Sequence, residues 1–161
     1  MSSLQEIQEF VNQIEIFDTH EHLAGFDWGF TTMDAPQGFA HPHKSLPHVL
    51  MNDMLLYFMA ATGHPVRDLA VWKWKLEDSE AYWKAIEPIL DEVRGAAVYT
   101  VIRRGLQELY GFEGDDITQD NWKALNEKVI STYQTKGAPQ WMLEVFKRAR
   151  VKKIIQMAHL P

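Results

Sequence analysis

Two short apolar segments near the ends of the chain, residues 14–19 and 151–158, constrain the fold more than any other feature. Both are rich in β-branched residues, and their apolar side chains point both ways, which predicts strands buried on both faces of a parallel sheet. Because the sequence between them has no hairpin turn, we expect a parallel pair joined by a long crossover. Two strands do not complete such a sheet, so we predict the N-terminal part of a larger barrel or sheet of the α/β class.

The stretch between the two predicted strands divides into a loop and a helical insert. Residues 23–47 mix glycine, proline and aromatic residues without regular spacing, and a loop of this length in a compact domain is usually functional. Residues 48–150 repeat apolar positions at helical spacing, and Gly111 is placed to end one of these helices. A further amphipathic helix is expected over residues 3–13, before the first strand.

The composition argues against several classes of function. The chain has 161 residues, a net charge of −6 and no dense stripe of Lys and Arg, so nucleic acid is not expected as a partner. No apolar run approaches the ~20 residues of a membrane span, and the N-terminus lacks a signal-peptide pattern, so we expect a cytoplasmic protein with no membrane partner. Since the sequence contains no cysteine, a metal ion would have to be bound by His, Asp or Glu.

The candidate metal ligands are His20 and His22, which follow the first predicted strand. Residues two apart in a strand point to the same side, so the two imidazoles can converge on one cation such as Zn²⁺. Asp18 has the same parity and is a candidate to accept an imidazole N–H from outside the metal shell. The alternatives are two polar histidines in a surface turn and an aspartate bonded to local backbone. Glu21 has the opposite parity and is expected to point away.

Four further residues are candidates for contact with a substrate or with the metal ligands. His41 and His43 flank Pro42 within the loop, and the extended backbone that proline favours would let both point the same way. Contact with solvent or substrate suits these two histidines better than metal ligation. Arg103, on a predicted helix, is a candidate to meet a substrate carboxylate, although a surface or ion-pair role is the simpler interpretation. His159 ends the second strand, next to the expected ligands of the first.

Residues 17–23, with the sequence FDTHEHL, resemble the first-strand signature of the amidohydrolase superfamily, whose members are metal-dependent (β/α)₈ hydrolases. The resemblance implies the N-terminal fragment of a (β/α)₈ TIM-type barrel. It also implies a divalent metal ion of the Zn²⁺ class held by His20 and His22, with the remaining ligands and the general base beyond residue 161. The helical insert resembles, more loosely, that of the uronate isomerase branch, over residues 99–112, 118–133 and 149–155.

These observations lead to three hypotheses of function. The first is a metal-dependent hydrolase that cleaves an amide, ester or lactone bond of a small-molecule substrate. The second is an aldose–ketose isomerase of the uronate type, which the resemblance of the helical insert favours. The third is a non-catalytic helical binding module in which the histidine pair is a relic. A homo-oligomer is compatible with each of them.

Overall fold

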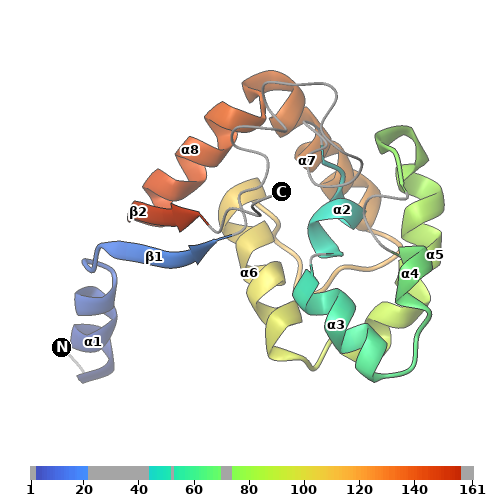
Figure 1. Ribbon diagram of the computed structural model, residues 1–161, viewed down its shortest axis with the longest axis horizontal. Helices are drawn as coiled ribbons and strands as arrows, with labels where there is room; N and C mark the ends of the chain where they lie inside the picture. Colours follow the sequence, from blue (N-terminus) through green and yellow to red (C-terminus); the bar gives the residue numbers. More distant parts are fainter. Residues whose placement is uncertain (1–2, 22–43, 52, 70–73, 157–161) are drawn as a thin grey trace.

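The computed structural model describes residues 3–21, 44–51, 53–69 and 74–156 (Figure 1). Within these residues the protein is mostly helical, with one small parallel sheet of two strands, an arrangement compatible with the α/β class. The elements in chain order are α1 (Ser3–Val11), β1 (Ile16–Glu21), α2 (Leu46–Leu50), α3 (Asp53–Ala61), α4 (Val66–Leu69), the 3₁₀ helix η2 (Leu76–Asp78), α5 (Ser79–Val93), α6 (Ala97–Tyr110), α7 (Trp122–Lys136), α8 (Ala138–Arg148) and β2 (Val151–Gln156).

The parallel pairing predicted from the missing hairpin turn is confirmed, since β1 and β2 form one parallel pair. The strand expected over 14–19 lies at Ile16–Glu21, two residues later. Its start is displaced because the turn that ends α1 uses the preceding residues: the N–H of Ile14 donates to the carbonyl of Val11 at 3.2 Å.

The strand expected over 151–158 is formed at Val151–Gln156, and residues 157–158 lie outside the described residues. The prediction that these strands are buried on both faces is wrong, since Phe17 and Ile155 are exposed. Both strands run with their carboxyl ends towards the helices α2 to α8, which we call the helical body (Figure 1).

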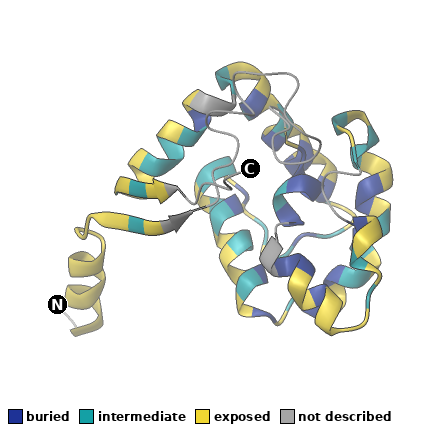
Figure 2. Ribbon diagram, in the orientation of Figure 1, coloured by how far each residue is buried: buried dark blue, intermediate teal, exposed yellow. Residues whose placement is uncertain are grey.

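The hydrophobic core lies in the helical body, and Figure 2 shows the buried residues gathered there. The short helix α2 is its centre, with Leu46 and Leu50 fully buried and with α5, α6 and α7 packed around it. A buried helix start needs partners for its backbone N–H groups. The side-chain oxygen of Asn126, on α7, supplies one by accepting the N–H of Leu46 at 2.8 Å. Trp83 and Trp122 stack at 5.0 Å between ring centres and join α5 to α7.

Gly111 ends α6 as predicted. Its φ of 62° lies in the left-handed region, where a side chain is disfavoured and glycine is the usual residue. The N–H of Gly111 donates to the carbonyl of Gln107 at 3.1 Å, and the N–H of Phe112 donates to the carbonyl of Leu106 at 3.3 Å. These bonds satisfy carbonyls that the end of the helix would otherwise leave unpaired.

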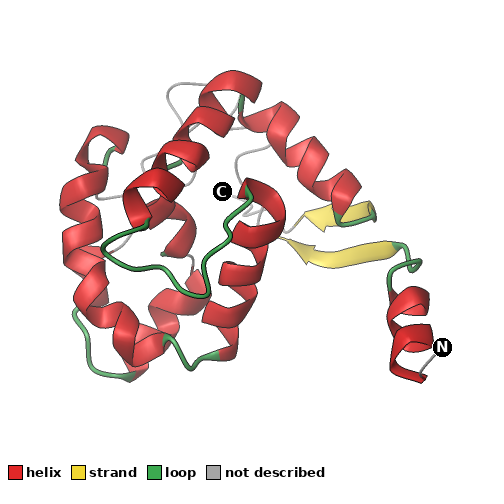
Figure 3. Cartoon of the chain, turned by 180° about the vertical axis from the view of Figure 1, so that it is seen from behind, coloured by secondary structure: helices red, strands yellow, loops and turns green. Residues whose placement is uncertain are grey.

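The helix α1 stands apart from the helical body, joined to it through β1 (Figures 1 and 3). The helix predicted over 3–13 is formed over Ser3–Val11, and every residue in it is exposed. For the residues that the structure describes, no helix combines the length and the hydropathy needed to cross a membrane.

Candidate metal centre

The candidate metal centre is the edge of the sheet at which β1 and β2 end. The strands pair from Ile16 opposite Val151 to Glu21 opposite Gln156, so their carboxyl ends lie side by side. Parallel sheets of α/β proteins bind ligands at this edge, because the chain leaves every strand on the same side. A group on the end of β1 and a group on the end of β2 therefore start from adjacent positions.

Two irregularities interrupt the pairing, and one of them lies within the histidine motif. Between Asp18 and Glu21, β1 advances by three residues while β2 advances by two, from Ile154 to Gln156. A register shift of this kind interrupts the regular alternation of side chains along a strand, and irregularities such as β-bulges are common beside functional sites. The expectation that Asp18 and His20 point to the same side rests on a regular strand, and this register shift interrupts that regularity.

Asp18 and His20 are the two predicted site residues that the structure brings into β1. Asp18 is half-buried and its backbone lies opposite Ile154. The side chain of His20 lies outside the described part of the structure, and so do the residues His22, His41, His43 and His159. Among the described residues there is no group of three or more His, Asp or Glu side chains that could hold a metal ion.

Charged side chains surround the start of the sheet. The ammonium of Lys152 and the carboxylate of Glu15 form an ion pair at 2.7 Å. The ammonium of Lys153 lies 5.9 Å from the centre of the Phe17 ring, so these two residues share one face of the sheet. Because neighbouring strand residues point to opposite faces, Phe17 and Asp18 project from opposite sides of β1.

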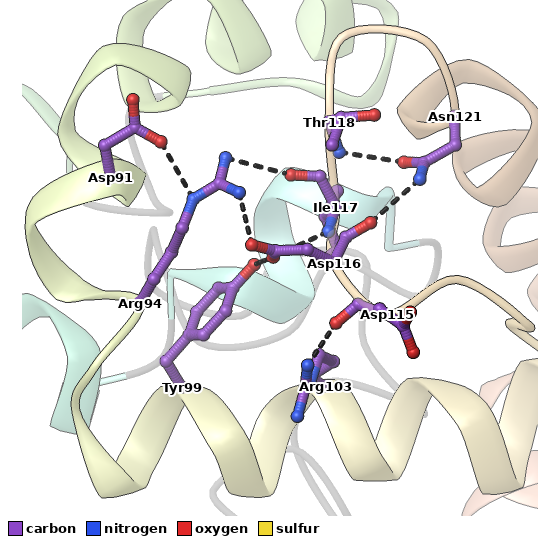
Figure 4. Close-up of polar contacts among 9 residues, drawn as sticks. All are labelled: Asp91, Arg94, Tyr99, Arg103, Asp115, Asp116, Ile117, Thr118 and Asn121. Atoms are coloured by element: carbon purple, nitrogen blue, oxygen red, sulfur yellow. Dashed lines mark hydrogen bonds and ion pairs between the residues drawn. The ribbon is translucent and has the colours of Figure 1, made fainter.

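Arg103, a candidate to meet a substrate carboxylate, is part of a different site. It lies on α6, and its guanidinium donates a hydrogen bond to the carbonyl of Asp115 in the loop after that helix (Figure 4). In this position the side chain holds the loop against the helix. The role in substrate binding stays a prediction that this contact does not support.

The loop between α6 and α7 carries a polar cluster that the sequence analysis missed (Figure 4). The carboxylate of Asp116 forms an ion pair with Arg94 and accepts a hydrogen bond from the hydroxyl of Tyr99 at 2.5 Å. It also accepts the backbone N–H of Ile117 at 2.8 Å. Arg94 in turn pairs through Nε with Asp91, at 2.8 Å. The pair of aspartates at 115–116, a few residues before a helix, was the available signal, but nothing in it identified Arg94 as the partner.

The electrostatics of this cluster favour its charged form. Partial burial opposes ionisation of Asp116, but the hydrogen bonds from Tyr99, from the N–H of Ile117 and from Arg94 outweigh it and lower the pKa of the carboxyl. Burial raises the pKa of the Tyr99 hydroxyl, and its bond to Asp116 raises it further. With its carboxylate engaged by three donors, Asp116 is suited to hold the loop rather than to transfer a proton.

A second polar pair is buried at the start of α2. The Ser45 hydroxyl lies 2.5 Å from Nδ1 of His48, and Nε2 of His48 lies 3.1 Å from the carbonyl of Trp74. A carbonyl only accepts, so Nε2 carries a proton, and in the neutral ring Nδ1 accepts the hydrogen bond from Ser45. Both side chains are buried in the helical body, where these bonds satisfy them. A serine and a histidine can act as nucleophile and base, but the burial and hydrogen bonds of Ser45 and His48 indicate a structural role.

Comparisons with known proteins identify no relative of this chain. No family model matches it, and neither a curated protein nor a solved structure matches it significantly.

Proposed function

We propose that this chain is the N-terminal portion of a metal-dependent hydrolase of the amidohydrolase type, with its metal ligands at the end of β1. The observation that carries the proposal is the parallel pairing of the strands, with Glu21 opposite Gln156. It supports a site at this edge because the motif of His20 and His22 begins on one strand end while His159 follows the other. The register shift at this end of β1 is a further supporting feature.

The donor set is suited to a Zn²⁺-class ion. In a chain without cysteine, neutral imidazoles are its preferred ligands, and His20 and His22 would hold the ion. When bound, such an ion supplies a polarising charge for a carbonyl oxygen and a lowered pKa for a water molecule, towards ~7. The protein's own contribution is to present both imidazoles unprotonated, so metal binding is expected to weaken below the ordinary histidine pKa of about 6.5.

The test is a calorimetric measurement of Zn²⁺ binding to the whole 161-residue chain. Two histidines provide half of a tetrahedral shell, so we expect weak binding that is abolished by His20→Ala and by His22→Ala. The matched control is His64→Ala, because His64 lies in the helical body and pairs with Glu92 at 3.0 Å. Binding that survives both substitutions, or that is lost in the control, contradicts the proposal.

A second candidate function is an aldose–ketose isomerase of the uronate type. The observation that favours it is the large helical body, which forms the connection between β1 and β2. A panel of amides, esters, lactones and uronates separates the two functions once the metal-loaded protein is assayed. Turnover of uronates without hydrolysis of the other compounds would reverse the ranking. A protein that binds no metal and turns over none of these compounds would instead support the non-catalytic binding module.

A further inference from the structure

The helix α1 presents an apolar stripe to solvent. The stripe consists of Leu4, Ile7, Phe10 and Val11, which recur at helical spacing, and 60% of Ile7 and 67% of Phe10 are exposed. A helix of nine residues is too short to be stable in water by itself, and helices of this length normally depend on packing of their apolar side. The stripe therefore requires a surface to cover it.

A matching surface lies on the sheet. Phe17, Lys153 and Ile155 form what we call the exposed sheet face, since Phe17 lies against Lys153 and Ile155 follows two residues later on β2. Phe17 is 56% exposed and Ile155 is 58% exposed. This face is opposite to the one from which Asp18 projects.

The charges of the two surfaces are complementary. The helix α1 carries Glu6 and Glu9 and no Lys or Arg. The segment 147–153, which leads into β2, contains five Lys or Arg among its seven residues, and all five are exposed. Among the described residues, no acidic side chain pairs with Lys147 or Lys153. Lys153 lies on the exposed sheet face, beside the Phe17 ring. An acidic apolar helix and an apolar sheet face that carries this lysine are therefore available to bind each other.

The two surfaces of one chain are held apart by the connector between them. The N–H groups of Gln13 and Ile14 donate to carbonyls of α1, at 3.0 Å and 3.2 Å. The guanidinium of Arg150 donates to the carbonyl of Asn12, and the carbonyl of Arg150 accepts the N–H of Ile16 at 2.9 Å. For α1 to lie over its own sheet, these contacts would have to break.

We infer that two copies of the chain associate by reciprocal exchange, with the α1 stripe of each covering the exposed sheet face of the other. If each of the six apolar side chains buries on the order of 100 Å², the two exchanges bury roughly 1,200 Å², the lower limit for a specific stable interface. Glu6 and Glu9 of one copy then lie near Lys147 and Lys153 of the other, and both surfaces are used twice in a closed dimer. This inference concerns the 161-residue chain by itself and does not rest on the proposed function.

Sedimentation equilibrium of the 161-residue chain tests the dimer, which should have twice the mass of the chain. We expect the double variant Ile7→Asp, Phe10→Asp to be monomeric. The matched control is Val101→Asp on α6, since Val101 is 70% exposed in the helical body and should leave the dimer intact. Tryptophan fluorescence, which reports the folded helical body, confirms that each variant is folded.

A charge exchange tests the arrangement itself. The variant Glu6→Lys, Glu9→Lys and the variant Lys147→Glu, Lys153→Glu should each weaken the dimer by at least about tenfold. An equimolar mixture should recover it as a heterodimer, because each helix then meets a sheet of opposite charge. A wild-type chain that stays monomeric, a dimer that survives the aspartate substitutions, or a mixture that recovers nothing would overturn the inference.

Discussion

Arg94, at the end of α5, forms an ion pair with Asp116, in the loop between α6 and α7, and joins segments that are 22 residues apart in the sequence. The same guanidinium donates to the carbonyl of Ile117 at 3.2 Å, so one side chain holds both the carboxylate and the backbone of the loop. The loop is closed from its other side by Asn121, whose amide donates to the carbonyl of Asp116 at 2.8 Å. This cluster is the best-defined polar site of the helical body (Figure 4).

Replacing Asp116 with Asn should destabilise the protein in a pH-dependent way. Because the pKa of Asp116 is lowered in the folded protein, its charge stabilises the fold above the ordinary aspartate pKa of about 3.9. That contribution is lost as the pH falls through the lower, folded-state pKa. We expect a loss of about 1–3 kcal/mol near neutral pH, and a smaller difference from wild type in acid. Urea unfolding of the wild type and the variant, near neutral pH and in acid, measures this difference in the free energy of unfolding.

The control for Asp116→Asn is Asp120→Asn, which removes the same charge from an exposed position in the same loop. It should change the free energy of unfolding by less than about 0.5 kcal/mol. Equal losses in the two variants would mean that net charge, and not the cluster, is responsible.

Replacing glycine with alanine should change the free energy of unfolding in opposite directions at two positions, one at the end of α6 and one inside it. Gly111→Ala should destabilise by about 1 kcal/mol, because its φ of 62° is strained for any residue with a Cβ. Gly105→Ala should stabilise by about 0.5–1 kcal/mol, because Gly105 is inside the helix and an added Cβ meets nothing within 4 Å. Thermal unfolding measures the change in stability of each variant. A change in the same direction for both variants would contradict this explanation.

Ser45→Ala should destabilise the helical body without affecting metal binding. The substitution removes the hydroxyl that lies 2.5 Å from Nδ1 of His48, and loss of a buried hydrogen bond costs about 1 kcal/mol. The comparison is Ser131→Ala on α7, where the serine is exposed and its hydroxyl donates to the carbonyl of Lys128. Urea unfolding should separate the two variants by at least about 1 kcal/mol.

The buried tyrosines should make the fold sensitive to alkali. Burial raises the pKa values of Tyr82, Tyr99 and Tyr133 above the usual range. The unfolded chain releases these protons near pH 10, so stability should fall as the pH rises above about 10. An absorbance titration of phenolate should show these groups ionising together with loss of helical circular dichroism. In urea the same groups should titrate near about pH 10, and an identical curve in the folded protein would count against the prediction.

Local signals in the sequence predicted the elements that depend on neighbouring residues. Gly111 predicted the end of α6, because a left-handed residue at a helix end is a local requirement. The absence of a hairpin turn predicted the parallel pair, because parallel strands need a long connection. The start of β1 was predicted two residues early, since Ile14 is apolar and β-branched but belongs to the turn after α1.

The sequence by itself therefore determined that most of residues 48–150 is helical, that the two strands pair in parallel, and that no metal ion can be bound through cysteine. The predicted loop over 23–47 ends earlier than expected, because α2 begins at Leu46. Only the tertiary structure decided the register shift between Asp18 and Glu21, the pairing of Arg94 with Asp116, and the exposure of the α1 stripe. The physical reason is distance along the chain. Periodicity and capping depend on residues a few positions apart, whereas register, ion pairs between helices and coverage of an apolar face depend on segments that only packing brings together.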